Sequence, residues 1–507
     1  MPRGVDLVRL MDGTAIPCSW RTRVAATMRA ADPLSATSWT TTRSPDRSVT
    51  IRVGVLTPHD ARSDTTAQTV PSPCDRRDLA GGDDGGTVRI RLAYGTTGLD
   101  IETPEERTTV VLPRHRPADP DPFAALVEAI RHPVAGPPLR DIARPGQTVA
   151  ISVCDITRPQ PRPSMLRAVL QELDGVVRRE DIVILVATGT HRTNTRDELA
   201  AMLGPDVLAE CRVVNHVARN RDSLVDLGMV DDVPVLLNRE WVAADLRITT
   251  GFVEPHFFAG FSGGPKMIAP GLAGIDTVLA LHNARRIGDP HATWGICEGN
   301  PVHDSVRAVA ALAPAAFGLD VLLNDDQEIT AAFGGPVPEM HAAARKAARA
   351  EAMVPVSGRF DLVITTNSGY PLDQNLYQAV KGMSAGAEIV RAGGTIIAAA
   401  ECRDGLPDHG SYAELLAQRD TPAELLTMIE SAPVTIPDQW QVQVQARVQS
   451  RARVLVHAAG LSHGQLAAAH FEAVDDIDAS IREFVAGDPA GRICVLPQGP
   501  QTIPYLA

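Results

Sequence analysis

The chain has 507 residues, about three times the length of a typical domain, so we expect two or three domains. Hydrophobic residues (44%) and charged residues (21%) occur in ordinary globular proportions, which exclude a largely disordered or fibrous protein. The net charge of −13 excludes a surface that coats nucleic acid, and no apolar run approaches the roughly 20 residues needed to span a bilayer.

Residues 1–86 are rich in Arg, Asp, Ser, Thr and Pro, contain neither Lys nor Glu, and show little hydrophobic periodicity. We expect a disordered extension, or a start of the reading frame placed too far upstream, with no part in the chemistry. Order is expected from Val88, where V-R-I-R-L alternates as in a half-buried strand.

Two helix starts can be placed from their caps. Asp121 is expected to cap a helix that has Pro122 at its first position. Thr195 and Glu198 form a capping-box pattern, and Gly204 is expected to end the helix that follows them.

Short apolar runs alternate with helical segments along the rest of the chain, a pattern that predicts parallel sheets covered by helices. The strand-like runs are 148–153, 181–186, 245–249, 361–365, 395–400, 453–458 and 492–496. The sequence therefore predicts an α/β fold with two domains, mainly parallel sheets and an active site in the cleft between the domains. We expect an N-terminal catalytic domain over 87–353, rejoined by 488–507, and a C-terminal domain over 354–487.

The seven cysteines are scattered, and no two of them form a C-x-x-C pair. This spacing argues against a disulfide scaffold and against a thiolate zinc site. The amino terminus lacks the apolar core of a secretory signal peptide. We therefore expect a cytoplasmic protein that engages neither nucleic acid nor membrane.

Lysine is scarce: of the 48 basic residues only three, Lys266, Lys346 and Lys381, are lysines, so the other 45 are arginines. Lysine can deprotonate and act as a nucleophile, whereas arginine does so only with difficulty. Lys346 lies in an alanine-rich helical run and is interpreted as a solvated surface charge. Lys266 and Lys381 lie in unusual local sequence and are candidate functional residues.

Polar side chains follow four of the predicted strands, at the edge where ligands bind in open α/β sheets. They are Asp155, Arg158, His191, His256, Lys266, Tyr377, Gln378 and Lys381. Asp155 and Arg158 are either a loop ion pair or a fork for a carboxylate or phosphate. His191 alone would be a structural histidine, but together with His256 it forms a plausible acid–base couple.

The segment G-F-S-G-G-P-K-M-I-A-P-G, residues 260–271, has glycines that let backbone amides approach an anion closely. It is not a P-loop, because Pro265 precedes the lysine and Met267 follows it where Ser or Thr is required. His282 lies near the end of the next short helix. Its spacing to other histidines fits no tetrahedral zinc pattern, so a metal bound there would need its other ligands from a cofactor.

The motifs D-I-T-R-P, A-T-G-T-H-R, E-P-H-x-x-A-G-F-S-G-G-x-K, L-H-N and Y-Q-A-V-K, in this order, resemble the lactate racemase catalytic subunit family. The resemblance covers roughly residues 87–507 and leaves 1–86 unmatched. It implies two α/β domains and a nickel-pincer nucleotide, pyridinium-3-thioamide-5-thiocarboxylic acid mononucleotide, made by separate cofactor-synthesis proteins.

The resemblance also assigns roles to residues. Lys266 matches the lysine that is joined covalently to the cofactor, His282 the protein ligand of nickel, and His191 and His256 the two acid–base histidines. Arg158 and Lys381 match groups that orient cofactor and substrate carboxylate. Asp155, Gln378, Tyr377 and Trp440 match further residues around the cofactor.

The function implied is racemisation or epimerisation of a 2-hydroxy acid by reversible hydride transfer. The α-hydrogen beside a carboxylate anion is very weakly acidic, so its removal as hydride is the better route. Two alternatives stay open: a cofactor-free isomerase that uses His191 and His256 as bases, and a non-catalytic homologue that binds a nucleotide or hydroxy acid. The sequence does not name the hydroxy acid or the oligomeric state.

Overall fold

The computed structural model describes residues 37–43, 49–55, 86–114, 116–407 and 410–507. The chain divides into two compact units, Met1–Pro73 and Cys74–Ala507. In the first unit, β1 (Thr37–Arg43) pairs antiparallel with β2 (Val49–Val55). The rest of the predicted disordered extension lies outside the described residues, so its disorder stays a prediction.

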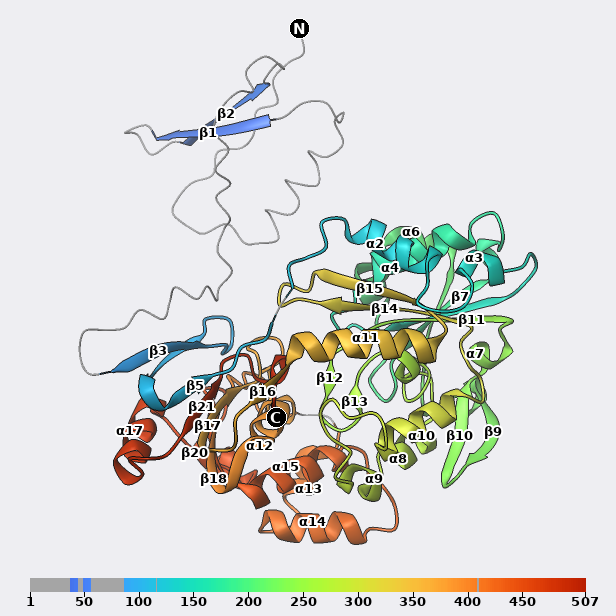
Figure 1. Cartoon of the computed structure of the whole chain (residues 1–507). Coiled ribbons are helices and arrows are strands. Elements are labelled where there is room, and N and C mark those ends of the chain that lie inside the picture. Colours follow the sequence, from blue (N-terminus) through green and yellow to red (C-terminus); the bar gives the residue numbers. More distant parts are fainter. Residues whose placement is uncertain (1–36, 44–48, 56–85, 115, 408–409) are drawn as a thin grey trace. The chain divides into compact units, whose positions relative to one another are not determined.

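The first large sheet of the second unit has the strand order β15-β14-β11-β6-β7-β8 (Figure 1). All neighbours run parallel except β15, which pairs antiparallel with β14. Every residue of β6 is buried, as expected of a strand covered on both faces. The strands are β6 (Val149–Cys154), β7 (Ile182–Ala187), β8 (Arg212–Asn215), β11 (Leu246–Phe252), β14 (Phe317–Leu323) and β15 (Ile329–Gly335).

The helices around this sheet confirm the caps predicted from the sequence. The Asp121 side chain accepts the Ala124 amide at the start of the first of them, α2, and Thr195 and Glu198 form a capping box at the start of α5. The helices of this part are α2 (Pro122–Arg131), α3 (Leu139–Ile142), α4 (Arg162–Leu173), α5 (Arg196–Leu203), α6 (Pro205–Glu210), α7 (Arg239–Ala243), α8 (Ile275–Leu281), α9 (Ala284–Gly288), α10 (Pro301–Ala310) and α11 (Val337–Ala352).

The second large sheet is entirely parallel, with the order β20-β19-β18-β17-β21-β5. Its strands are β5 (Thr108–Val110), β17 (Phe360–Thr366), β18 (Val390–Ala399), β19 (Arg453–His457), β20 (Glu472–Ala473) and β21 (Ile493–Leu496). Its helices are α12 (Leu376–Ala387), α13 (Tyr412–Leu416), α14 (Pro422–Ser431), α15 (Gln439–Arg451), α16 (His463–Ala468) and α17 (Ile477–Gly487). The two sheets confirm the predicted α/β class.

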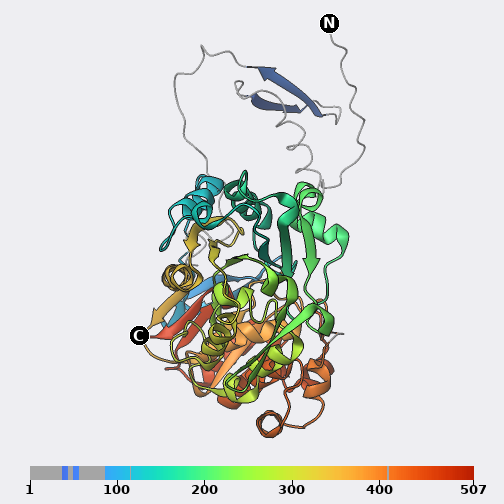
Figure 2. The same ribbon diagram turned by 90° about the vertical axis from the view of Figure 1, so that its right-hand side faces the viewer.

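The second sheet contains strands from near both ends of the range 86–507, which differs from the predicted domain limits. The sequence predicts that 488–507 rejoins the first domain, yet β21 lies between β17 and β5 in the second sheet (Figure 2). Likewise β22 (Ile503–Leu506) pairs with β16 (Met353–Val356). The N-terminal hairpin of β3 (Thr87–Leu92) and β4 (Leu99–Pro104) also packs its apolar face on the core of the second sheet. An apolar run predicts a buried strand, but it does not say which sheet the strand joins.

Within the described part of the chain, no helix is both long and apolar enough to cross a membrane.

Candidate active site

The first sheet changes winding direction between β6 and β11, and the predicted site residues gather at this point. From β6 the chain proceeds to β7 and β8 on one side, and later to β11 and β14 on the other. Ligands of open α/β sheets bind at such a switch point, beyond the carboxyl ends of the strands. Arg158 follows β6, His191 follows β7 and His256 follows β11. The two histidines therefore come from the strands on either side of the strand that carries Arg158.

The loop after β6 is held by residues that the sequence reasoning did not single out. The buried guanidinium of Arg162 donates hydrogen bonds to the carbonyls of Cys154, Asp155 and Arg158. Gln160 accepts the Cys154 amide at 2.7 Å and donates to the Thr250 hydroxyl at 2.8 Å. These bonds fix the backbone while leaving the Arg158 side chain exposed.

His191 and Asp155 form a dyad. His191 Nδ1 lies 2.7 Å from Asp155 Oδ2, and the Thr157 hydroxyl donates to Asp155 Oδ1 at 2.7 Å. Burial alone would raise the pKa of Asp155, but the hydrogen bonds from His191 and Thr157 and the charge of Arg158 outweigh it and lower the pKa. An ionised Asp155 accepts a hydrogen bond from Nδ1–H, which leaves Nε2 of His191 as the acceptor.

His256 has the opposite arrangement. It lies in the hairpin of β12 (Pro255–His256) and β13 (Gly260–Phe261), and its Nδ1 accepts the Ala259 amide at 3.3 Å. The proton of the neutral ring is therefore on Nε2. Burial, followed by the charges of Lys266, Lys381 and Arg158, lowers the pKa of His256 well below its usual value. As the chain stands, Nε2 of His256 is a hydrogen-bond donor and Nε2 of His191 is a hydrogen-bond acceptor.

Lys266 lies in η5 (Gly264–Met267), a tight turn whose first residues adopt a backbone conformation that glycine tolerates best. Gly263 and Gly264 have φ of +71° and +52°, in the left-handed region that side chains disfavour. Burial, then Arg158 and Lys381, lower the pKa of Lys266 to about 7, although Glu254 opposes this. About half of the amine is therefore neutral at neutral pH and able to act as a nucleophile.

His282 ends α8 and is nearly buried, with 9% of its surface exposed. Its Nδ1 donates to the Val278 carbonyl at 2.8 Å, so the lone pair of Nε2 is free. Burial lowers its pKa to about 4, which keeps the ring neutral. The Trp440 ring lies 4.8 Å from it and the Phe258 ring 5.4 Å. A neutral imidazole with one oriented nitrogen is a competent metal ligand.

The second domain contributes α12 and α15, which lie side by side (Figure 1). Lys381 Nζ on α12 lies 6.0 Å from the centre of the Phe257 ring, and Lys266 Nζ lies equally far from the Phe258 ring. The two phenyl rings are in contact, at 4.5 Å between centres. Burial, followed by Arg158, lowers the pKa of Lys381 to about 8. The two lysines, which belong to different domains, thus lie near the same pair of phenyl rings.

The aromatic and amide residues predicted for the site lie on the same two helices. Trp440 Nε1 on α15 donates to the Tyr377 hydroxyl at 3.2 Å, and Trp440 also packs on His282. Burial raises the pKa of Tyr377, so it stays neutral. Gln378 is half-buried on α12, one position after Tyr377. Its backbone amide donates a hydrogen bond to the Asn375 side chain at 3.0 Å.

Glu254 is a site residue that the sequence reasoning missed. It belongs to the E-P-H motif and carries the negative charge that faces Arg158, Lys381 and Lys266. Burial raises its pKa, and the three cations only partly offset that effect. Arg158, Lys381 and the protonated fraction of Lys266 thus gather around this carboxylate, and such a cluster of cations suits an anionic ligand.

The residues present fit a metal held jointly by the protein and a cofactor. Within the described ranges, no group of three or more His, Cys, Asp or Glu side chains could hold a metal ion by itself. His282 offers one free nitrogen, and Lys266 offers a partly neutral amine in the same site. A tethered cofactor with soft donor atoms would complete such a ligand set, and soft donors in a plane suit nickel.

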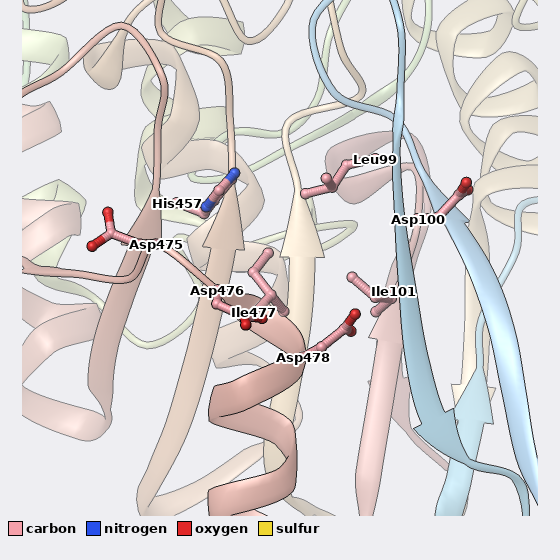
Figure 3. Close-up of a pocket in the computed structure, with 8 residues that line it drawn as sticks. All are labelled: Leu99, Asp100, Ile101, His457, Asp475, Asp476, Ile477 and Asp478. Carbon is pink, nitrogen blue, oxygen red and sulfur yellow. The ribbon is translucent and has the colours of Figure 1, made fainter.

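A pocket of about 150 Å³ in the second domain is a different feature (Figure 3). Its carboxylates are engaged by neighbouring groups: Asp475 pairs with His463, Asp478 accepts the Glu102 amide, and Asp476 caps α17. None of the predicted site residues lines it.

Comparison with known proteins identifies the family. Models of the lactate racemase N-terminal and C-terminal domains match residues 94–295 and 357–503. The lactate racemase of Thermoanaerobacterium thermosaccharolyticum is 35% identical over 73% of this chain and 88% of its own length. The chain belongs to the lactate racemase family. The lactate racemase of Lactiplantibacillus plantarum, also 35% identical, covers the same shares of the two chains.

Solved structures agree with this assignment. The lactate racemase apoprotein from T. thermosaccharolyticum superposes with a TM-score of 0.77 at 32% identity, over 82% of this chain and all of that one. A Thermotoga maritima protein with 17% identity and a TM-score of 0.58, over 77% of this chain and all of that one, shares the fold. Family membership confirms the predicted enzyme class: the protein is an isomerase of the racemase type.

Proposed function

We propose that the protein racemises or epimerises a short 2-hydroxy acid, with lactate as the first substrate to test. The observation that carries this proposal is the pair of histidines with opposite proton positions, at strands that flank the strand of Arg158. Family relatives named as lactate racemases support the same substrate class. The cluster of Arg158, Lys266 and Lys381 supports a carboxylate ligand.

The cofactor of this proposal is the nickel-pincer nucleotide. Lys266 would hold it covalently and His282 would ligate the nickel, with Tyr377, Gln378, Trp440 and Asp155 around it. When bound, this group supplies a reversible acceptor for the hydride of the substrate α-carbon. Its synthesis requires separate proteins, which are the partners that we propose for this chain. We place the reaction in the cytoplasm.

The side chains of the protein account for the proton chemistry. Arg158 and Lys381 bind the substrate carboxylate and keep it oriented, which removes most of the entropic cost of the reaction. His191 Nε2, polarised by Asp155, takes the hydroxyl proton as the α-hydrogen leaves. The product of this step is a planar 2-keto acid, whose two faces lead to opposite enantiomers. After it turns over, His256 takes a second proton from solvent and returns one from Nε2 to the oxygen, while His191 releases to solvent the proton that it took, and the opposite enantiomer is formed.

The decisive test is intact-protein mass spectrometry with metal analysis, after co-expression with the cofactor-synthesis proteins. We expect an added mass of mononucleotide size on the peptide that contains Lys266, together with near-stoichiometric nickel. Lys266→Met should lose the added mass, while Lys346→Met, which alters an exposed lysine on α11, should keep it. An unmodified Lys266 without nickel, beside a loaded control racemase, would favour the cofactor-free isomerase or the binding protein.

His282→Ala tests nickel binding independently of the covalent attachment at Lys266. We expect this variant to keep its circular dichroism spectrum and to lose nickel, because His282 Nε2 is the free imidazole nitrogen of the site. Racemisation of L-lactate, followed by polarimetry, then measures the activity that depends on the metal.

A further inference from the structure

A buried carboxylic acid lies directly behind the turn that carries Lys266. Asp320 belongs to β14 and is fully buried. Its Oδ2 accepts the amide of Gly264 at 2.8 Å, so the acid bonds to the first residue of η5. Its other oxygen, Oδ1, is buried without a hydrogen-bond partner among the described residues. Burying a carboxylic acid with an unpaired oxygen costs free energy of folding. A group with such a cost calls for an explanation, and a structural or functional role supplies one.

The two glycines nearest Asp320 show how closely the carboxyl group is fitted. A Cβ atom on Gly263 would lie 2.8 Å from Asp320 Oδ2, and a Cβ on Gly251 would lie 2.8 Å from Oδ1. Any side chain at either position would displace the carboxyl group. The glycine at 263 is therefore needed for the left-handed turn and for contact with Asp320.

A second bond holds the same turn from the opposite direction. His341 on α11 donates its Nε2 proton to the Ser262 carbonyl at 2.8 Å. Burial lowers its pKa to about 3, so the ring is neutral and Nε2–H is the donor. The His341 ring also fills the space beside Gly264, where a Cβ would meet it at 2.5 Å. The turn is thus fixed by an acceptor on β14 and a donor on α11.

We propose that Asp320 is a positioning residue for Lys266: its carboxyl group holds the Gly263–Lys266 turn and thereby keeps the lysine amine in its enclosed, reactive position. The inference rests on the proposed role of Lys266 as the covalent attachment point. Asp320 itself contacts the backbone of the turn and is not assigned any contact with substrate or cofactor.

The test uses the scarcity of lysine in this chain. Cofactor-free protein is treated with an amine-acylating reagent across a range of pH, and the labelled fractions of Lys266, Lys381 and Lys346 are read by peptide mass spectrometry. Lys346 is exposed and serves as the reference within the same molecule. The groups that interact electrostatically with Lys266 stay unchanged in every variant compared; they are Arg158, Glu254, Cys297, Lys381, His256, His282, His303 and His341.

Two near-isosteric variants give opposite expectations. In Asp320→Leu the Gly264 amide loses its acceptor, the turn relaxes and the amine gains water, so the labelling midpoint of Lys266 should rise by at least one pH unit. In Asp320→Asn the amide oxygen still accepts the Gly264 proton, so the midpoint should stay near that of the wild type. A purely structural role would lower the unfolding temperature of both variants without moving the Lys266 midpoint.

The proposal is overturned if folded Asp320→Leu labels Lys266 at the wild-type midpoint, or if Asp320→Asn shifts it as far as Asp320→Leu. Should Asp320→Leu fail to fold, hydrogen exchange in the wild type decides the matter. The Gly264 amide should then be strongly protected, and rapid exchange of that amide would overturn the proposal. Because no cofactor is present, this outcome is independent of whether Lys266 proves to carry one.

Discussion

Nδ1 of His191 and Oδ2 of Asp155 are 2.7 Å apart, and this contact sets which nitrogen of the histidine faces away as a base. The two residues follow neighbouring parallel strands, β7 and β6, so the fold itself delivers the pair. His256 lacks such a carboxylate and takes its orientation from backbone amides. The two histidines are therefore unequal before any ligand binds.

Asp155→Asn should lower kcat by roughly 10²- to 10⁴-fold, because the amide no longer fixes the base tautomer of His191. KM should change far less. The measurement is the initial rate with each enantiomer of the substrate at saturating concentration. Thr157→Val, which removes the other hydrogen bond to Asp155, is the matched control and should retain most of the activity. Equal losses in the two variants would mean that the loop conformation, rather than the His191 contact, is what matters.

Glu254→Gln should make both active-site lysines easier to acylate. The Glu254 charge raises the pKa of Lys266 and of Lys381, so its removal should lower the labelling midpoint of each by roughly one pH unit. The midpoint of Lys346 should not move. Peptide mass spectrometry after labelling across a pH range checks all three residues together. Unchanged midpoints at Lys266 and Lys381 would show that Glu254 lies too far away to balance them.

Lys266→Met should stabilise the cofactor-free protein, and by an amount that depends on pH. The pKa of Lys266 is lowered from 10.5 to about 7 in the folded state, mainly by burial. Below pH 7 the folded state bears the full cost of the buried charge, and this cost vanishes as the pH rises to about 10.5, where the unfolded chain also loses the proton. The gain in Tm should therefore be largest near pH 6 and fall as the pH rises towards 10.

Thermal unfolding at several pH values checks this expectation, with Lys346→Met as the control. That exposed substitution should give a small change in Tm without a trend with pH. A gain in Lys266→Met that grows with pH would contradict the proposed burial of the amine.

Gln443→Leu should weaken nickel retention in the loaded protein. Gln443 on α15 donates to the Ala284 carbonyl at 2.9 Å, two residues after the metal-ligand candidate His282. Gln449→Leu is the matched control on the same helix, because Gln449 donates to the His470 carbonyl far from His282 in the chain. Gln443→Leu removes one hydrogen bond and Gln449→Leu removes two, because Gln449 also accepts from Gln445 at 3.3 Å; at about 1 kcal/mol a bond, the control should lose at least as much Tm. Only Gln443→Leu should release nickel faster, as measured by metal content after dialysis.

Much of the candidate site could be predicted from the sequence because parallel strands place their carboxyl ends at one edge. That geometry predicts that Arg158, His191 and His256 lie at one edge of a sheet. In the structure they follow β6, β7 and β11, which are neighbours in the first sheet. Lysine scarcity predicts a role for Lys266 and Lys381, and the structure places them near the contacting rings of Phe258 and Phe257.

Other residues could not be found in this way. Glu254 precedes a proline and a histidine in the same motif, and nothing in its spacing distinguishes a site carboxylate from a solvated one. Asp320 interrupts the apolar run of β14, a strand missing from the predicted set, and a charged residue there argues against a buried strand. Its burial depends on the turn from Gly263 and on α11, elements distant in sequence.

The parallel strand β21 has a consequence for synthesis on the ribosome. It pairs with β17 on one side and with β5 on the other, so the middle of the second sheet is filled by a segment that is made long after both of its neighbours. Until Ile493–Leu496 has emerged, the edge of β17 stays unpaired and open to association with other chains. The first sheet is complete by Gly335 and can fold while translation continues. In a nascent chain, the sheet of the Lys266 domain would therefore be complete well before the sheet of the Lys381 domain. A chain that stops before β21 would leave the edge of β17 unpaired and available to chaperones.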